Sequence, residues 1–462
     1  MMLKFLLFLG LVSLLLVSPV WAVSDPRSNP NNIVGINILS PEAEIEEAAS
    51  LVNSNGDWGW AVIVIKKSER NLDRWQGVFN LMARYHLIPI VRLATDFDDL
   101  GYWRRPSEED VKDWADFLSK LYWPTKNRYV QIYNEVNRAS EWGGKVDAFG
   151  YAVELNKTID ALRAKSSDFF ILNAPLDLSL ETAENALDAA VFLQTMENTS
   201  SGVFEKLDGW ASHSYPNPGF SASPLASGRT GIDGFKWELN MISDYINNRD
   251  LPVFITETGW RRANKTGGLS EEQIAQNYKI AFEKIWSDAR VMVVAPFVFD
   301  FPEALFNEFS FSANNDEKKY YDYYFAVKDL AKVKGEPVRE NLASDLQISQ
   351  SYLIIQDFSS EVTLKISNIG NYIWNTQEGL SLDAKSENME VGPVVWDREE
   401  VYPGQEITGT FKVKSKVEGT LPFSVKIRDG DQVLAQKDIT FLSETYLSLF
   451  INALKTVFDI IG

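Results

Sequence analysis

Two glutamates offer the clearest chemistry in this sequence. An apolar run that alternates with the period of a β-strand ends at Asn134-Glu135, and a second run, residues 251–255, ends close before Glu257. A carboxyl group can act as a general acid, a general base or a nucleophile. Two strands that each end in a carboxyl therefore predict one shared site.

The elements that would position these glutamates alternate regularly along the chain. Short apolar runs predict eight strands, at residues 33–39, 61–65, 88–93, 129–132, 169–173, 207–216, 251–257 and 291–299. Amphipathic stretches predict eight helices, at residues 41–52, 72–85, 108–121, 147–164, 181–196, 235–246, 270–286 and 318–333. Eight strand–helix pairs predict an α/β fold, a (β/α)8 TIM barrel over residues 23–337. A doubly wound open sheet is the alternative, which the count of eight disfavours.

The hydrophobic pattern changes after residue 337. Residues 361–366, 405–413 and 423–427 alternate with period two, and Asp429-Gly430 is a hairpin-turn signal. These features predict a smaller all-β domain at residues 338–443, an antiparallel immunoglobulin-like β-sandwich. The domain has no evident catalytic cluster, so we expect it to brace the barrel.

The last segment, residues 444–462, predicts an amphipathic helix. Its apolar side chains recur at helical spacing, at Leu447, Phe450, Ile451, Leu454, Val457, Phe458 and Ile461. Packing onto the protein is the simpler expectation for this helix. A peripheral membrane or cell-surface contact is the alternative, although the polar face carries little positive charge.

Residues 1–22 have the order of a secretory signal peptide. Lys4 precedes an apolar run at residues 5–17, and Val20-Trp21-Ala22 provides a cleavage site. An uncleaved membrane anchor is the alternative. Either one predicts a secreted or extracellular, cell-surface location.

The composition excludes several classes of chemistry. The chain has no cysteine and only two histidines, which rules out disulfides, thiolate sites and three-histidine metal sites. It also lacks a His-Glu-x-x-His motif, a phosphate-binding glycine loop, a dinucleotide fingerprint and a Gly-x-Ser-x-Gly motif. The excess of 64 acidic over 45 basic residues disfavours nucleic acid as a partner. We therefore expect neither a metal nor a cofactor.

The polar residues at the strand ends would meet at one face of the barrel. In this fold the active site lies at the C-terminal ends of the strands. Glu135 and Glu257 would face each other across the mouth, with Arg92 from the third strand and His213 and Tyr215 from the sixth. A structural ion-pair role for Arg92 and a purely structural role for His213 are the alternatives.

Over residues 33–333 the sequence resembles the clan A retaining glycoside hydrolases, on the family 5 and family 39 side of the clan. The motifs that carry this resemblance are Tyr133-Asn134-Glu135, His213-Ser214-Tyr215 and Ile255-Thr256-Glu257-Thr258-Gly259-Trp260. The resemblance implies that Glu135 is the acid/base and Glu257 the nucleophile of an enzyme that cleaves β-glycosidic bonds in a polysaccharide or glycoconjugate. Asn134 would then bond the sugar 2-hydroxyl, a contact that strengthens in the transition state.

The residue chemistry agrees with those roles. Retention of configuration needs two carboxyls about 5 to 5.5 Å apart. If Arg92 and Tyr215 stabilise an ionised Glu257, the charge of Glu257 raises the pKa of Glu135 and keeps it protonated. His213 would support Glu135 or bind a substrate hydroxyl.

Aromatic residues suggest further substrate contacts. Trp103, Trp142 and Trp260 fall on predicted βα loops, where an indole face can stack on a pyranose ring. Anchoring of a loop is the alternative for each. Where the resembled family commonly has a tryptophan in the eighth strand, this chain has Phe297 and Phe299, of which we expect Phe299 to contact the substrate.

Two other functions use the same barrel. A non-catalytic carbohydrate-binding or surface-assembly protein would keep the fold, but it has no need for both carboxyls. A transglycosidase would use the same residues and differ only in excluding water as acceptor. A secreted retaining glycoside hydrolase with a carbohydrate substrate remains the leading hypothesis.

Overall fold

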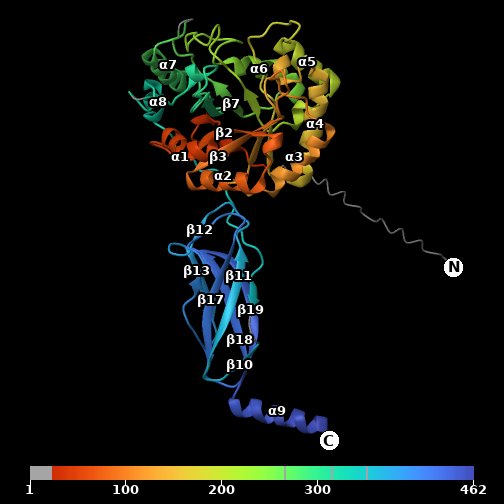
Figure 1. Ribbon diagram of the computed structural model, residues 1–462, viewed down its shortest axis with the longest axis vertical. Helices are drawn as coiled ribbons and strands as arrows, with labels where there is room; N and C mark the ends of the chain where they lie inside the picture. Colours follow the sequence, from red (N-terminus) through yellow and green to blue (C-terminus); the bar gives the residue numbers. More distant parts are fainter. Residues whose placement is uncertain (1–22, 265–266, 314, 316, 350–351, 462) are drawn as a thin grey trace, which may run out of the picture.

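The computed structural model describes residues 23–264, 267–313, 315, 317–349 and 352–461, and Figure 1 shows their arrangement. The predicted signal peptide, residues 1–22, lies outside the described residues. A helix-covered barrel forms one end of the molecule, a β-sandwich extends from it, and a final helix follows the sandwich.

The barrel contains eight parallel strands, as predicted. They are β1 (Gly35–Ile38), β2 (Gly59–Lys66), β3 (Leu87–Ala94), β4 (Arg128–Gln131), β5 (Phe169–Leu172), β6 (Trp210–Ser212), β7 (Val253–Thr258) and β8 (Val291–Pro296). Strands β1 to β5 pair in sequence order, and so do β6 to β8. Parallel bridges at Leu172–Gly209 and Val34–Val294 join the two sheets into a closed ring. The open-sheet alternative is therefore wrong.

The helices between the strands cover the outside of the ring. They are α1 (Pro41–Val52), α2 (Leu72–Arg84), α3 (Glu108–Lys120), α4 (Ala148–Lys165), α5 (Ala189–Thr199), α6 (Gly234–Ile242), α7 (Glu271–Lys284) and α8 (Asp322–Lys328). Local signals fix several starts: Asn71 caps α2 by accepting from Arg74 N, and Ser270 with Gln273 forms a capping box on α7. Their apolar faces pack against the strands in one continuous core.

The helix predicted at residues 181–196 begins later than expected. Residues 183–187 instead pair with the loop that follows β4: Ala139 N donates to Asn185 O, and Leu187 N donates to Asn137 O. The side chain of Asp188 then caps α5 by accepting from the N–H groups of Ala190 and Val191. Backbone pairing with a distant loop thus replaces the first helical turns.

The barrel interior is filled by side chains from alternate strand positions. Trp60, Ile88, Tyr129, Phe170 and Phe254 form its central apolar cluster with smaller neighbours. The same alternation places polar residues at the C-terminal ends, because side chains two residues apart lie on one face of a strand. Arg92 follows Ile88 and Ile90 in this way.

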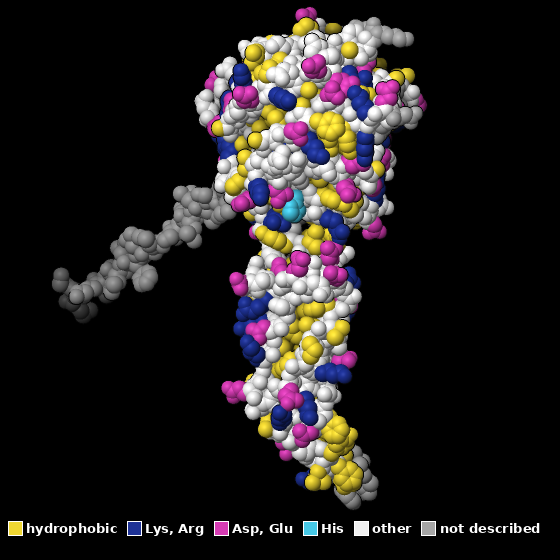
Figure 2. Space-filling view, turned by 90° about the vertical axis from the view of Figure 1, so that its left-hand side faces the viewer, with side chains coloured by type: hydrophobic (Ala, Val, Ile, Leu, Met, Phe, Trp, Pro, Cys, Tyr) yellow, Lys and Arg dark blue, Asp and Glu magenta, His cyan; other side chains and the backbone are white. Residues whose placement is uncertain are grey.

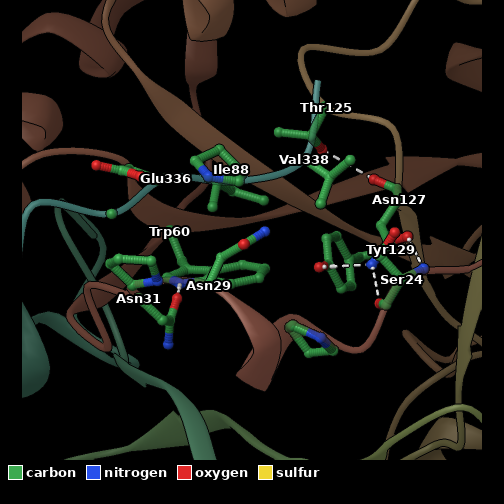
Figure 3. A pocket seen from close by; sticks show the side chains of 14 residues that line it. Ser24, Asn29, Asn31, Trp60, Ile88, Thr125, Asn127, Tyr129, Glu336 and Val338 are labelled. Carbon is green, nitrogen blue, oxygen red and sulfur yellow. Dashed lines mark hydrogen bonds between the residues drawn. The ribbon is translucent and has the colours of Figure 1, made fainter. Parts of the chain in front are cut away.

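The N-terminal end of the barrel, opposite the ends that carry the glutamates, is closed by residues that surround a small cavity (Figure 3). Ser24 and Asn127 exchange hydrogen bonds of 2.9 and 2.7 Å, and Trp60 Nε1 donates to Asn31 Oδ1 at 3.1 Å. The cavity left between these residues measures about 20 Å³. That volume holds about one water molecule, so the N-terminal segment acts as a plug.

The second domain is a β-sandwich, as predicted. Its strands are β9 (Gln347–Ser349), β10 (Leu353–Ile355), β11 (Ser359–Ser367), β12 (Trp374–Asn375), β13 (Leu380–Lys385), β14 (Met389–Val391), β15 (Val395–Trp396), β16 (Glu400–Val401), β17 (Glu406–Ser415), β18 (Gly419–Asp429) and β19 (Gln432–Glu444). One sheet has the order β10-β19-β18-β13 and the other β14-β17-β11-β9. Their inner faces share a separate apolar core. The predicted Asp429-Gly430 turn joins β18 to β19, with Gly430 at φ +54°.

The sandwich contacts the N-terminal end of the barrel. Lys126 N donates to Val338 O at 2.8 Å, and Asn371 Nδ2 donates to Trp123 O at 2.9 Å. Lys126 and Trp123 lie on the loop that leads from α3 into β4, and such loops form the N-terminal face. The sandwich therefore lies on the side of the barrel opposite the strand ends that carry the glutamates.

The final helix, α9 (Tyr446–Ile461), lies at the far end of the sandwich (Figure 1). Leu447 and Phe450 are 67% and 62% exposed, and Figure 2 shows apolar side chains gathered at this end of the molecule. Of the α9 residues whose side chains the structure describes, none belongs to either apolar core. No helix in the described part of the chain is long and apolar enough to cross a membrane.

Candidate active site

Strand β7 delivers Glu257 to the barrel mouth through an irregularity in its pairing. The register between β7 and β8 shifts between Ile255 and Thr258. Such a shift re-aims a side chain that strict alternation would direct elsewhere. Gly259 follows at φ +147°, a conformation that other residues rarely adopt, and a Cβ there would lie 3.0 Å from the Tyr278 hydroxyl.

Strained backbone also positions Glu135. After β4 the chain adopts left-handed φ values at Tyr133 (+67°) and Glu135 (+32°), which non-glycine residues seldom do. Hydrogen bonds hold this conformation: Gln131 Nε2 donates to Tyr133 O at 3.1 Å, and Arg138 N donates to Glu135 O at 2.8 Å. Backbone strain of this kind gathers where the surrounding structure over-determines a functional side chain.

The two carboxyls meet around His213. One ligand atom from each of Glu135, His213 and Glu257 lies within 4.8 Å of the other two. His213 Nδ1 is 2.9 Å from Glu135 Oε1 and 3.7 Å from Glu257 Oε2, and the imidazole is buried. His213 therefore bridges the two carboxyls.

Glu257 has two further partners. Arg92 Nη1 donates to Glu257 Oε1 at 3.3 Å, and the Tyr215 hydroxyl donates to Glu257 Oε2 at 3.3 Å. Desolvation and the charge of Glu257 raise the pKa of Tyr215, which keeps its hydroxyl protonated as a donor. The two groups therefore donate to the Glu257 carboxyl, one to each oxygen.

The protonation of Glu135 differs from the sequence-based expectation. Burial favours its neutral form, but the hydrogen bond to His213 and the charges of His213, Arg138 and Arg92 outweigh burial and lower the pKa of Glu135. The expected rise in this pKa is therefore wrong: His213 lies closer to Glu135 than to Glu257, and a further cation, Arg138, was not revealed by the sequence pattern. Burial lowers the pKa of His213, but the charge of Glu257 and the hydrogen bond with Glu135 more than offset it and raise that pKa overall.

The structure brings most of the predicted residues together but leaves three aside. Trp103 is half-buried, lines a small cavity with Arg92 and Asn134, and has the Arg92 guanidinium 5.8 Å from its ring centroid. Trp142, Trp260 and Phe299 are only 2–3% exposed. Their role as substrate contacts stays a prediction, and in this structure the three rings pack in the core and offer little open surface.

The contacts of these three residues explain their burial. Trp142 packs edge-on against Tyr133 and Tyr151, and Trp260 packs against Tyr278 and Trp286. The aromatic surface near β8 is provided instead by an aromatic wall of five phenylalanines: Phe220, Phe297, Phe301, Phe306 and Phe309. Phe220 and Phe309 also contact the ring of Tyr215, so the wall adjoins the Glu257 site.

Sequence reasoning missed two charged residues of the site, Arg138 and Glu141. Both lie within six residues of Glu135, on the loop and the 3-10 helix η3 (Ala139–Glu141) that follow β4. Arg138 Nε is 3.0 Å from Glu135 Oε2, and its guanidinium also pairs with Asp177. The one signal in the sequence is their closeness to the Asn134-Glu135 motif.

The same cluster can be tested as a metal site. Glu135, His213 and Glu257 offer three ligand atoms within reach of one ion. The guanidinium groups of Arg92 and Arg138 already neutralise these carboxylates. A further cation would be repelled by both arginines, so the donor set fits proton transfer better than metal binding.

Comparisons of the fold find glycoside hydrolases. The chain is similar to a family 39 glycoside hydrolase from Bacteroides cellulosilyticus WH2, with a TM-score of 0.46 and 12% identity over 85% of this chain and 82% of that one. It is also similar to the catalytic domain of a family 26 endo-β-1,4-mannanase from Bacillus sp. JAMB-750, with a TM-score of 0.43 and 15% identity over 65% and 85%. A β-mannanase from Streptomyces thermolilacinus gives a TM-score of 0.39 and 14% identity over 64% and 89%. No protein-family model matches the sequence, and no curated protein does.

These neighbours are of the class that the sequence resembles, and the first belongs to one of the two families expected. Fold and site together define a (β/α)8 barrel with paired carboxyls at its C-terminal face.

Proposed function

We propose that the protein is a retaining glycoside hydrolase that cleaves β-glycosidic bonds, with Glu257 as nucleophile and Glu135 as acid/base. The observation that carries this proposal is the closeness of the two carboxyls: one carboxylate oxygen of Glu135 lies within 4.8 Å of one of Glu257. Inverting enzymes need about 6.5 to 9.5 Å between carboxyls to admit a water, whereas retaining enzymes use about 5 to 5.5 Å.

In the first step the ionised Glu257 attacks the anomeric carbon and the bond to the leaving oxygen breaks. Glu135 gives a proton to that oxygen, so the aglycone departs as an alcohol and the sugar stays esterified to Glu257. Because the pKa of His213 is raised, the imidazole can carry that proton and pass it along the 2.9 Å contact to Glu135.

In the second step Glu135 accepts a proton from water, whose oxygen attacks the anomeric carbon. The ester bond to Glu257 breaks and the sugar leaves with its original configuration. Arg92 and Tyr215 stabilise the carboxylate that re-forms on Glu257. Asn134 would bond the 2-hydroxyl, while Trp103 and the aromatic wall would contact apolar faces of the substrate.

The proposal extends to where the protein works. The signal-like residues 1–22 and the apolar face of α9 support a secreted protein that contacts a membrane or cell surface peripherally. Leu447, Phe450, Ile451 and Leu454 are 40–67% exposed, enough to enter the interfacial region of a bilayer.

Covalent trapping tests the reaction. Incubation with a panel of 2-deoxy-2-fluoro β-glycosides that carry good leaving groups is expected to add one sugar mass to the intact protein, and peptide mapping is expected to place it on Glu257. The Glu257→Gln variant is the matched control and should take no label. A label on another residue would contradict the assignment of the nucleophile.

The same panel with ordinary substrates separates the alternatives. Hydrolysis with retained configuration supports the proposal. Binding without turnover across the panel would favour a carbohydrate-binding protein. Products that are mainly transferred to sugar acceptors would favour a transglycosidase.

A further inference from the structure

Glu141 is a third carboxyl beside the two that the proposed reaction uses. It is the last residue of η3, and two backbone contacts hold that turn: Ala139 N donates to Asn185 O at 2.9 Å, and Trp103 N donates to Ser140 O at 2.8 Å. Only 18% of the Glu141 side chain is exposed. The carboxyl is therefore fixed from behind and faces the site.

Glu141 contacts two residues of the proposed machinery at once. Its Oε2 accepts a hydrogen bond from Asn134 Nδ2 at 3.4 Å and lies 3.7 Å from Arg92 Nη2. The other terminal nitrogen of Arg92 donates to Glu257 at 3.3 Å. Glu141, Asn134 and Arg92 line a cavity of about 10 Å³ together with Trp103. One carboxyl thus links the amide beside the acid/base to the guanidinium beside the nucleophile.

The charge state of Glu141 fits such a place. Burial raises its pKa to about 7, the cation of Arg92 opposes that rise, and the charges of Glu135 and Glu257 add to it. Burial makes the Glu141 carboxyl costly to ionise. Such a group is unfavourable in a folded protein unless neighbouring residues interact with it, so its position points to a function.

We propose that Glu141 is a positioning residue that fixes the Asn134 amide for substrate recognition and holds Arg92 against the nucleophile. This inference rests on the proposed glycosidase function. An asparagine amide turns readily about its last side-chain torsion. Glu141 accepts a hydrogen bond from one N–H of Asn134 Nδ2 and so fixes the direction of the other. We assign this second N–H as the donor to the sugar hydroxyl next to the anomeric carbon.

The test compares two substrates that differ in that hydroxyl alone. In Glu141→Leu, which removes the acceptor at similar size, kcat on the 2-hydroxy glycoside is expected to fall roughly 10- to 100-fold, since small misplacements of a positioning group cost up to about 10². On the matching 2-deoxy glycoside the variant should stay within about threefold of the parent, because Asn134 has no hydroxyl to bind there and the variant loses only the support of Arg92. KM should change less than kcat in both cases.

Three further variants make the test selective. Glu141→Gln keeps an oxygen acceptor and should recover most of the 2-hydroxy activity. In an Asn134→Ala background, Glu141→Leu should have little further effect on the 2-hydroxy substrate. Glu154→Gln is the matched control, because Glu154 is a neighbouring carboxyl with a pKa raised to about 7 by burial that bonds Tyr133 instead; it should leave both substrates unaffected.

The outcomes are distinguishable. Equal losses on both substrates, or no loss on either, would overturn the positioning role while leaving the glycosidase intact. If Glu141→Leu does not fold, Glu141→Ala takes its place and must show the same selective loss. A parent protein that hydrolyses neither substrate class would instead contradict the proposed function.

Discussion

Arg138 Nε lies 3.0 Å from Glu135 Oε2, three residues along the chain. The proposed acid/base is thus held between a guanidinium and the imidazole of His213, while the proposed nucleophile contacts Arg92 and Tyr215. Each carboxyl has its own cation, and His213 lies between them. The charges of the two carboxyls are therefore coupled through His213. Removing the cation beside either carboxyl should alter proton transfer at the site.

Removing the Arg138 charge is expected to move the pH profile. In Arg138→Met the pKa of Glu135 rises, because a cation that lowers it is gone. Glu135 then keeps its proton to higher pH, so the high-pH limb of kcat/KM moves to higher pH. Arg290→Met, which breaks an ion pair with Asp288 far from the site, is the control and should leave the limb in place. A shift to lower pH would contradict this electrostatic account.

Replacing Trp142 should mainly affect stability, and replacing Trp103 should mainly affect substrate binding. Trp142→Ala is expected to lower the free energy of unfolding by roughly 3 to 5 kcal/mol, since its ring is 3% exposed in the core. Trp103→Ala should lower it far less and raise KM instead, by about fivefold, as stacking on an apolar sugar face would supply roughly 1 kcal/mol. Urea unfolding and steady-state kinetics measure the two effects. Equal destabilisation by both changes would place Trp103 in the core as well.

Glu238 should make stability depend on pH. Burial raises its pKa from 4.5 to about 8, with Ser212 as its bonded neighbour. The folded protein holds that proton more tightly than the unfolded chain. The protonated carboxyl therefore adds fully to the free energy of unfolding below about pH 4.5, and this stabilisation is lost as the pH rises through 8. The loss is on the order of 4 kcal/mol. Between pH 5 and 8 the free energy of unfolding, measured in urea, should decline more in the parent than in Glu238→Gln. Equal declines with pH in the two proteins would rule out Glu238 as the cause.

The exposed apolar side chains of α9 should allow the protein to bind lipid vesicles. We expect the full chain to float with neutral phosphatidylcholine vesicles, and a variant with Leu447→Asp and Phe450→Asp to remain in solution, since buried apolar area drives such binding. Activity on a soluble substrate should be the same in both, because Leu447 and Phe450 are exposed and belong to neither apolar core. Equal flotation of the two proteins would contradict a contact through this face.

The barrel could be predicted because its pattern is local and repeated. Continuous apolar runs at the strands, and capping residues such as Asn71 and Ser270 at the helices, act within a few residues of the element that they define. The strand ends then indicate the face at which Arg92, His213 and Glu257 meet. The helix predicted at residues 181–196 failed in its first half because its backbone pairs with residues about 50 positions earlier.

The site could be predicted only in part, for related reasons. An indole on a predicted loop can face solvent or the core, and nothing local to Trp142 or Trp260 distinguishes the two. The lowered pKa of Glu135 depends on a guanidinium whose direction is fixed by Asp177, 39 residues further on. Glu141 matters only because η3 turns its side chain back toward Asn134.

The attachment of the sandwich to the N-terminal face gives the molecule a polarity along its long axis. One end of the molecule carries α9 and the other carries the barrel (Figure 1), whose N-terminal loops, and not the strand ends with the glutamates, contact the sandwich. If α9 holds the protein at a surface as proposed, the whole sandwich stands between that surface and the barrel. The proposed active site would then be held away from the surface, and it would act on chains that reach it from solution rather than on the surface itself.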